Sequence, residues 1–317
     1  MTISDIISKD HSTGFSFEVL PPLKGNGTSA LFRTIDTLKE FNPKYINITT
    51  HRSEYVYQPQ ADGSYIRQSI RRRPGTIAVA SAIMQKYDIK VVPHVVCSGF
   101  SAEDLEYMLL DLQFLGITDL LLLRGDKAKD EPRFNPVPGG YNHTTELIEQ
   151  VNRFNQGFFN DGTQIRVPGA PFSFGVACYP EKHEEAPNLD FDLQVLKMKQ
   201  TLGANYAITQ LFYDNKKYFD FVERAKAEGI TIPIIPAIKP MTKLSQFTVV
   251  PKTFHLDLPV ELSREAERCT TDEAIAQLGV EWATQQCREL IAHGVPSIHF
   301  YTMSAVESIR KIAANIY

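Results

Sequence analysis

The segment TDLLLLRGD, residues 118–126, is the part of the sequence that most directly predicts the fold class. Its four consecutive leucines show no polar alternation, so both faces of the strand that they form must be buried. Strands of this kind belong to parallel sheets that helices cover on their faces. Arg124, Gly125 and Asp126 follow at the carboxyl end of the strand. The segment therefore predicts an α/β protein that carries functional side chains at its strand ends.

Similar apolar runs recur along the chain, and segments with helical periodicity lie between them. The predicted strands are 14–19, 45–50, 90–97, 118–125, 172–179, 205–214, 231–238 and 297–303. The predicted helices are 29–41, 76–87, 101–116, 144–154, 191–203, 216–229 and 272–294, and Gly116, Gly203 and Gly229 fall just past three helix ends, where a left-handed residue is favoured. Eight such units in 317 residues predict a single-domain (βα)8 TIM barrel over residues 1–317. The alternative is an open, doubly wound sheet.

The composition excludes several classes of function. A net charge of −4 and a pI of about 6.1 give no reason to expect nucleic acid or an anionic membrane as a partner. The N-terminus has no signal-peptide pattern and no apolar run is long enough to span a membrane, so we expect a cytoplasmic protein. The four cysteines have no CxxC spacing, which predicts reduced thiols. His94 and Cys97 lack a second pair of ligands, so we expect no metal.

Two segments depart from the alternation of strands and helices. Residues 127–141 and 153–171 are rich in Gly, Pro and Asn, which predicts loops. The basic run IRQSIRRRPG, residues 66–75, is interpreted as the solvent-exposed start of a helix in preference to a phosphate-binding surface. We also expect a long connection between the seventh and eighth strands, ending in the helix 272–294.

The predicted strands all end in polar side chains. These are Glu18, Thr49 to His51, His94, Arg124 to Asp126, Tyr179 to His183, Gln210, Lys239, and Tyr301 with Thr302. Because catalytic residues of (βα)8 barrels lie at the carboxyl ends of the strands, we expect these side chains to share a pocket. By period-2 alternation, Glu18 lies on the strand face opposite Phe15 and Phe17. Taken alone, it would be an exposed carboxylate on an edge strand.

Six motifs in this order carry a resemblance to a known family: FEVLPP (17–22), VVPHVVC (91–97), LLRGD (122–126), CYPEKHEEA (178–186), GANYAITQLFYD (203–214) and HFYTM (299–303). With them, most of residues 14–303 resembles the methylenetetrahydrofolate reductase family, in its form without a regulatory domain. The resemblance implies a flavoprotein oxidoreductase of one-carbon metabolism and methionine biosynthesis. Such an enzyme binds FAD and uses NADH or NADPH to reduce 5,10-methylenetetrahydrofolate to 5-methyltetrahydrofolate. We also expect a homo-oligomer.

The resemblance further implies roles for individual residues. Glu18 would be the general acid that opens the imidazolidine ring of the folate, partly desolvated beside Phe15 and Phe17. Asp126 would favour the resulting 5-iminium cation, and Gln210 would contact nicotinamide and pterin in turn. The implied FAD-binding residues are Thr49, His94, Arg124, Gly125, Asp126, Ala177, Tyr179, His183, Ala186, Asp192 and Lys199. The implied folate-binding residues are Glu18, Asp126, Gln210 and Gln246.

Some positions depart from the family pattern. Thr50 stands where an aromatic residue is common, Val195 and Met198 replace polar FAD-contacting residues, and Ala305 stands where an arginine often binds the folate tail. Two other functions stay open: a flavin-binding barrel of the proline dehydrogenase kind, and a non-catalytic folate-binding or scaffold protein. A flavin absorbance spectrum of the purified protein separates the enzymes from the scaffold, and reoxidation by methylenetetrahydrofolate separates the two enzymes.

Overall fold

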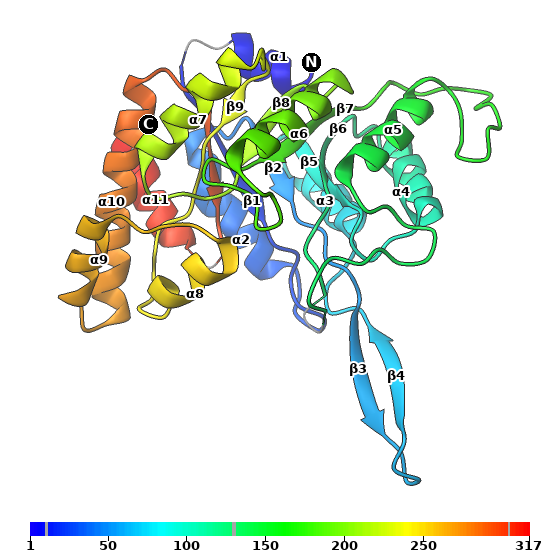
Figure 1. The fold of residues 1–317 in the computed structure, drawn as a ribbon, viewed down its shortest axis with the longest axis horizontal. Coiled ribbons are helices and arrows are strands. Elements are labelled where there is room, and N and C mark those ends of the chain that lie inside the picture. The colour runs from blue at the N-terminus through cyan, green and yellow to red at the C-terminus, as the bar shows by residue number, and fades with distance from the viewer. Residues whose placement is uncertain (10–11, 129–130, 304) are drawn as a thin grey trace. The chain divides into compact units, whose positions relative to one another are not determined.

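Parallel strands and helices alternate along the computed structural model, which describes residues 1–9, 12–128, 131–303 and 305–317 (Figure 1). The strands are β1 (Gly14–Val19), β2 (Tyr45–Ile48), β3 (Glu54–Pro59), β4 (Tyr65–Ile70), β5 (Val91–Val96), β6 (Asp119–Leu123), β7 (Ser173–Cys178), β8 (Tyr206–Thr209), β9 (Ile234–Ile235), β10 (Ala237–Ile238) and β11 (Ser297–Tyr301). The α-helices are α1 (Ile3–Lys9), α2 (Ser29–Leu38), α3 (Thr76–Lys86), α4 (Ala102–Phe114), α5 (Thr144–Asn155), α6 (Leu189–Thr201), α7 (Asn215–Ala227), α8 (Gln246–Phe254), α9 (Val260–Glu267), α10 (Asp272–Ala292) and α11 (Val306–Ile316). A 3₁₀ helix, η1 (Lys39–Phe41), follows α2.

The predicted strands and helices are confirmed, with strand ends that differ by a few residues. β1 has the predicted bounds, whereas the strand predicted to reach residue 214 ends at Thr209. Polar caps begin several helices: Ser101 and Asp104 form a capping box at α4, and Asp214 and Thr271 cap α7 and α10. Gly116, Gly203 and Gly229 have φ values of 71°, 105° and 79°, as predicted for residues that end helices.

The described chain divides into two compact units, and the first contains residues 1–19, 33–47 and 173–317. Its strands β7, β8 and β9 pair in parallel order, and so do β10, β11 and β1. β9 and β10 are one passage of the chain, interrupted at Pro236, which has no N–H to donate to the ladder. The Pro236 carbonyl still accepts a hydrogen bond from His299 N at 3.0 Å. On the outside of this unit, α10 packs against α7, α9 and α11.

The second unit contains residues 20–32 and 48–172, with β5 and β6 as its parallel pair. His94, Val95 and Val96 of β5 lie opposite Leu121, Leu122 and Leu123 of β6. β6 contains the four leucines, of which the first three are buried and Leu123 is partly buried. This agrees with a strand whose two faces are both covered.

The strand order identifies the fold class. The parallel strands of the described residues form one sheet in the order β10-β11-β1-β2-β5-β6-β7-β8-β9. Because β9 and β10 at the two ends of this order are consecutive in the chain, the order describes a nearly closed barrel. Counting β9 and β10 as one passage gives the eight strand positions that the sequence predicts, and the α/β barrel is confirmed over the open sheet.

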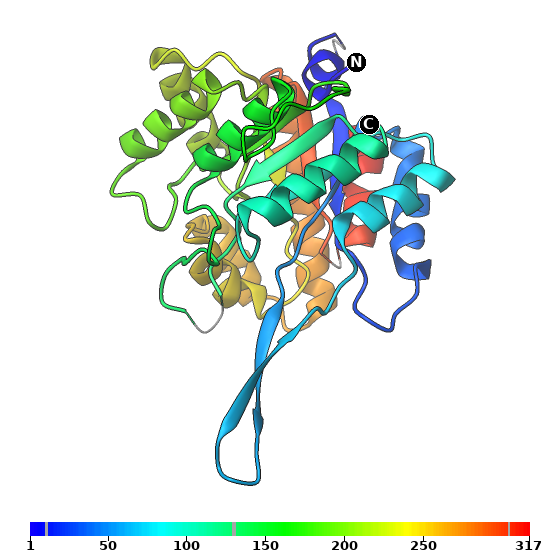
Figure 2. The same cartoon turned by 90° about the vertical axis from the view of Figure 1, so that its right-hand side faces the viewer.

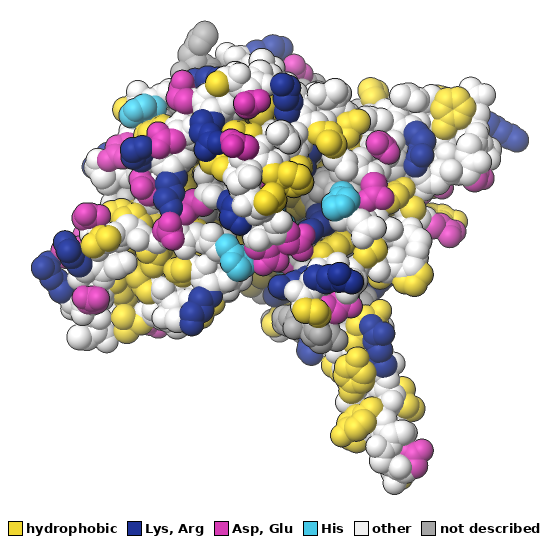
Figure 3. Space-filling model, viewed as in Figure 1, with side chains coloured by type: hydrophobic (Ala, Val, Ile, Leu, Met, Phe, Trp, Pro, Cys, Tyr) yellow, Lys and Arg dark blue, Asp and Glu magenta, His cyan; other side chains and the backbone are white. Residues whose placement is uncertain are grey.

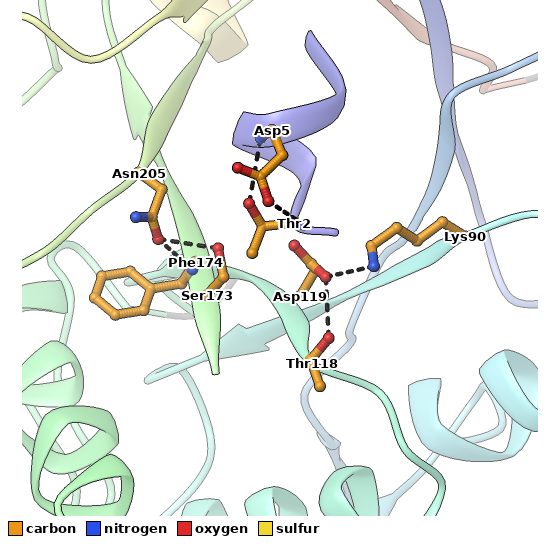
Figure 4. A network of polar contacts seen from close by, with 8 residues as sticks. All are labelled: Thr2, Asp5, Lys90, Thr118, Asp119, Ser173, Phe174 and Asn205. Atoms are coloured by element: carbon orange, nitrogen blue, oxygen red, sulfur yellow. Dashed lines mark hydrogen bonds and ion pairs between the residues drawn. The ribbon is translucent and has the colours of Figure 1, made fainter. Parts of the chain in front are cut away.

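Polar contacts hold the amino-terminal ends of several strands (Figure 4). In the first unit, the Asn205 side-chain oxygen accepts hydrogen bonds from Ser173 Oγ and Phe174 N, at 3.0 and 3.1 Å. In the second unit, the Asp119 carboxylate is 1% exposed and lies 2.8 Å from Lys90 Nζ. The Thr118 hydroxyl donates to the same carboxylate at 3.2 Å. These contacts lie at the end of the strands opposite to the predicted chemistry, where a stabilising role is expected.

A β-hairpin corrects the prediction for residues 66–75. In the structure β4 pairs with β3 in antiparallel register from Glu54 opposite Ile70 to Pro59 opposite Tyr65, so the start of the predicted helix is wrong. Gly63, at φ 81°, closes the turn after Asp62, and helix α3 begins only at Thr76. The hairpin extends away from β5, β6 and their helices in two perpendicular views (Figures 1 and 2).

The connection between the last two barrel strands also holds more structure than predicted, because α8 and α9 lie within it. Helices α1 and α11 were not among the predicted helices. The predicted loop 127–141 contains no helix or strand at its described positions, and residues 129–130 lie outside the described residues. The predicted loop 153–171 begins inside α5 and is otherwise irregular, apart from one antiparallel bridge between Phe158 and Gln164. None of the helices in the described part of the chain is long and apolar enough to cross a membrane.

Candidate active site

Glu18 is the most strongly perturbed carboxyl group at a strand end. It is 8% exposed and lies near the end of β1, which β11 flanks in parallel register. Burial raises the pKa of Glu18 to about 8, because a carboxylate loses its hydration there. An exposed edge-strand carboxylate is therefore ruled out. At neutral pH the side chain is mainly a carboxylic acid, which can give up a proton.

The two faces of β1 have different surroundings. Phe15 and Phe17 lie on the face opposite Glu18, as the alternation predicts, and Phe15 packs against the rings of Phe300 and Tyr317, both at 5.5 Å. The face of Glu18 carries Ser16 and His299, which are hydrogen-bonded at 2.9 Å.

Tyr301 lies opposite Glu18 in the register of β1 and β11. Burial raises the pKa of Tyr301 well above its ordinary value, with further contributions from the charges of Glu18 and Tyr179. The Tyr301 hydroxyl donates a hydrogen bond to the Thr209 carbonyl at 2.8 Å. Tyr301 is thus a neutral phenol between the end of β1 and the end of β8, and it belongs to the same polar cluster as Glu18 and Tyr179.

The ends of β7 and α6 bring together five of the predicted FAD-binding residues. Lys199 Nζ, in a side chain that is 8% exposed, donates to the Ala177 carbonyl at 3.1 Å. The Asp192 carboxylate accepts from His183 N at 2.7 Å, and the rings of His183 and Tyr179 meet edge to face at 4.8 Å. Lys199 also acts electrostatically on Asp192, as expected for two residues seven apart on one helix face.

Two predicted contacts take part in local turns. Gln210 N donates to the Cys178 carbonyl at 2.8 Å, and the Gln210 side-chain oxygen accepts from Leu211 N at 2.9 Å. This leaves the amide nitrogen of Gln210 as the end of the side chain that can turn toward a ligand. The Gln246 side-chain oxygen accepts from Thr242 N at 2.7 Å and from Lys243 N at 3.2 Å, so it organises the turn before α8.

In the second unit, the segment after β6 is tied to the segment after β5. Ser98 N donates to the Arg124 carbonyl at 2.9 Å, and Ser98 Oγ donates to the Asp126 carbonyl at 2.6 Å. Both bonds are accepted by backbone carbonyls, so neither involves the Asp126 carboxylate. Asp126 is an exposed residue at the strand end. The Arg124 guanidinium lies over the Phe134 ring, 4.7 Å from its centroid.

Gly125 is required for a reason that differs from the predicted one. Its φ is 79°, and a Cβ at this position would lie 2.8 Å from Ser98 Cβ. The backbone conformation and the contact with Ser98 therefore already require a glycine. The predicted close approach of a flat ligand to Gly125 is an additional role that these contacts do not test.

The ends of β2 and β5 form a second polar group in this unit. Thr50 Oγ1 donates to the His94 carbonyl at 2.5 Å, and Thr49 Oγ1 lies 3.1 Å from His51 Nε2. Burial lowers the pKa of His94 to about 3, and the charge of His51 adds to this effect. His94 is therefore a neutral imidazole at physiological pH, which can donate and accept hydrogen bonds without carrying charge.

Lys239 is a residue whose unusual environment the sequence does not reveal. It follows β10, is 3% exposed, and its Nζ has no hydrogen-bond partner among the described residues. Burial lowers its pKa. The polar position at a strand end was visible in the sequence, but the depth of burial depends on the surrounding strands and helices.

Of the other predicted residues, Ala186 is buried beside the Lys182 and His183 segment, and its carbonyl accepts from Lys182 Nζ at 2.8 Å.

Comparisons with known proteins show the family of this chain. A family model described as methylenetetrahydrofolate reductase matches residues 2–317. The chain is 28% identical to methylenetetrahydrofolate reductase (NADH) 1 of Arabidopsis thaliana, over 98% of this chain and 49% of that protein. It is also 28% identical to 5,10-methylenetetrahydrofolate reductase of Salmonella typhimurium, over 92% of this chain and 86% of that protein. The chain thus spans about half the length of the plant relative and most of the bacterial one.

A solved structure has the same fold. It is described as an uncharacterized protein from Clostridium thermocellum that binds two copies of 5-methyl-5,6,7,8-tetrahydrofolic acid. The TM-score is 0.59 at 14% sequence identity, and the match covers 99% of this chain and 98% of the other. At this identity the likeness concerns the fold.

Proposed function

Because this chain belongs to the methylenetetrahydrofolate reductase family, we propose that it reduces 5,10-methylenetetrahydrofolate to 5-methyltetrahydrofolate. NADH or NADPH would supply the hydride, and FAD, when bound, would allow a ping-pong sequence of two half-reactions. The observation that carries this proposal is the buried Glu18 carboxyl group, whose pKa is raised to about 8 by burial. An acid that keeps its proton at neutral pH is what opening of the imidazolidine ring requires.

Glu18 acts first in the half-reaction with folate. Its carboxyl group donates a proton to the folate, the bond between the bridging carbon and N10 breaks, and a 5-iminium cation forms on the substrate. Thr302 Oγ1 donates to the Glu18 backbone carbonyl at 2.7 Å, which supports the position of the acid at the end of β1. Loss of the proton leaves a buried carboxylate. Because burial of a charged group costs free energy, the carboxylate takes up a proton again before the next turnover.

Asp126 and Gln210 have different tasks. The Asp126 carboxylate stabilises the cationic iminium relative to the neutral ring, because opposite charges attract most where water is displaced by substrate. Its backbone is held by Ser98, whose hydroxyl donates to the Asp126 carbonyl, so the position from which the carboxylate extends is fixed. Gln210 offers its amide nitrogen as a hydrogen-bond donor, since Leu211 N already occupies the side-chain oxygen.

The chain's donor set is suited to FAD, which combines a flat ring system with an anionic diphosphate. In the first unit, Tyr179, His183, Ala186, Asp192 and Lys199 with the Ala177 backbone would hold it. In the second unit, Thr49, His94, Arg124, Gly125 and Asp126 would do so. Lys199 and Arg124 supply positive charge, and the neutral His94 supplies an uncharged donor. When bound, FAD would carry hydride from the nicotinamide nucleotide to the folate.

The test is a pair of half-reactions on the purified protein. We expect a flavin absorbance spectrum, bleaching by NADH or NADPH under anaerobic conditions, and recovery of absorbance with methylenetetrahydrofolate. Bleaching by proline, with no recovery on addition of methylenetetrahydrofolate, would identify the proline dehydrogenase kind of enzyme, and a colourless protein would favour a scaffold. The homo-oligomeric state, the cytoplasmic location and the role in methionine biosynthesis stay predictions.

A further inference from the structure

The loop that follows β7, residues 179–186, is held by a segment that lies far along the chain, residues 255–257, which we call the clamp. The loop contains Tyr179, His183 and Ala186, which we have assigned to FAD. The clamp joins α8 to α9 and has no role in the mechanism above. Both segments belong to the first unit.

Glu181 makes the inner contact between the loop and the clamp. Its carboxylate accepts a hydrogen bond from Asp257 N at 3.0 Å and pairs with Lys217 Nζ of α7. Lys217 Nζ also lies 2.7 Å from the Asp257 carboxylate. The Glu181 side chain is only 11% exposed, so loss of its carboxylate takes a strong acceptor from two donors in a place that water reaches poorly.

Glu184 makes the outer contact. Its carboxylate lies 2.7 Å from His255 Nε2, and the two side chains are 29% and 50% exposed. His255 ends α8 in the left-handed conformation, with φ 53°. The next residue, Leu256, is buried and packs in an apolar cluster with Val250 of α8. The clamp is therefore fixed to the core of the unit, and the loop is attached to the clamp.

The backbone of the loop needs such support. Lys182 has a φ of 141°, a conformation that residues other than glycine rarely adopt. Backbone of this kind persists where the surrounding contacts fix it. The contacts of Glu181 and Glu184 with the clamp lie on either side of Lys182 in the sequence. They are thus placed to keep the loop in this conformation.

Pairs of opposite charge also occur elsewhere on this unit. Acidic and basic side chains lie close together over α7 and α9 (Figure 3), and the Lys226–Glu223 pair of α7 has side chains that are 64% and 73% exposed. Exposed pairs of this kind contribute little to stability. The contacts of the clamp differ from them, because they are partly buried and join segments that are distant in sequence.

We propose that Glu181, Glu184 and His255 are positioning residues that set how tightly the loop 179–186 retains FAD. The inference rests on the proposed function, because FAD must first bind at this loop. None of the three side chains has to touch the cofactor. The clamp keeps the loop in one conformation before FAD arrives, so less conformational freedom is lost when the cofactor binds.

The rate of FAD release from the whole protein measures this retention, and the fluorescence of the freed flavin after dilution reports it. Glu184→Gln and His255→Asn should each speed release by about two- to fivefold, the effect of a partly exposed pair. Asparagine is chosen because it tolerates the left-handed conformation of residue 255. Glu181→Gln should speed release by about tenfold, because its donors lie in a more buried place.

A reversed pair and a matched control separate positioning from a general loss of stability. Glu184→Lys alone should release FAD faster, whereas Glu184→Lys/His255→Asp restores opposite charges at the two positions and should return release toward that of the unaltered protein. Glu223→Gln makes the same chemical change as Glu184→Gln at the exposed pair of α7 and should leave release unchanged. Thermal unfolding of the flavin-free proteins should differ by no more than a few degrees.

Hydrogen exchange of the flavin-free protein gives a readout that does not depend on the cofactor. The amides of residues 181–186 should exchange faster in Glu184→Gln and His255→Asn than in the unaltered protein. Release from these two variants at the rate of Glu223→Gln would overturn the inference, as would faster exchange of the loop without faster release. Both results leave the proposed function standing, whereas an unaltered protein that binds no FAD refutes the proposed function and this inference with it.

Discussion

Replacing Glu18 by glutamine tests the proposed mechanism most directly. The change keeps the size and polarity of the side chain but removes the proton that the acid donates. At pH 7, a carboxyl group of pKa about 8 is about 90% protonated, whereas one at 4.5 is only about 0.3% protonated. Burial therefore raises the amount of the acid form about 300-fold at this pH.

Stopped-flow absorbance measures the two half-reactions separately. In Glu18→Gln, flavin reduction by NADH should stay nearly unchanged, because hydride transfer from nicotinamide needs no proton from the protein. Reoxidation by methylenetetrahydrofolate should slow by at least about 10², the usual contribution of a general acid. In the unaltered protein the folate half-reaction should decline as the pH rises through about 8, because the acid form is lost there.

A surface variant provides the control. Glu228→Gln changes an exposed residue that follows α7 and should alter neither half-reaction. Equal losses in both half-reactions of Glu18→Gln would refute the role of Glu18 as the acid. So would a folate half-reaction that is slow in the variant but independent of pH between about 6 and 9 in the unaltered protein.

Three further predictions concern charge and stability. Asp126→Asn should slow reoxidation by folate while the purified protein keeps its flavin spectrum, and a colourless variant would contradict this assignment. Because the Glu18 pKa is higher in the folded state, its stabilising effect is complete below about pH 4.5 and is lost as the pH rises through about 8. The free energy of unfolding, measured in urea for the unaltered protein relative to Glu18→Gln, should therefore fall by a few kcal/mol between about pH 5 and 9. A difference that stays constant over this range would contradict the raised pKa. Lys90→Met removes the cation beside the buried Asp119 and should lower the unfolding free energy by about 1–3 kcal/mol. The control Lys39→Met, at the exposed Lys39–Asp36 pair, should lower it by less than about 0.5 kcal/mol. Equal effects of these two substitutions would show that burial of Asp119 does not matter.

The sequence by itself determined the alternation of strands and helices. Continuous apolar runs such as the leucines of 120–123, helix caps such as Ser101, and glycines after helix ends act within a few residues. Local physics is enough to predict such elements. The hairpin was also accessible, because Tyr55 to Tyr57 and Tyr65 to Ile70 flank an Asp-Gly turn, but the arginines after it drew the prediction toward a helix start.

The family motifs predicted which residues take part in the site, but their environments depend on the tertiary structure. Period-2 alternation put Glu18 and Phe15 on opposite faces, yet only the folded chain decided that Glu18 is also buried, at 8% exposed. Desolvation by residues distant in sequence sets the pKa of Glu18 and of His94. In the same way, Ser98 determines why residue 125 is a glycine. A local pattern reports the direction of a side chain, whereas its charge depends on all the groups that replace water around it.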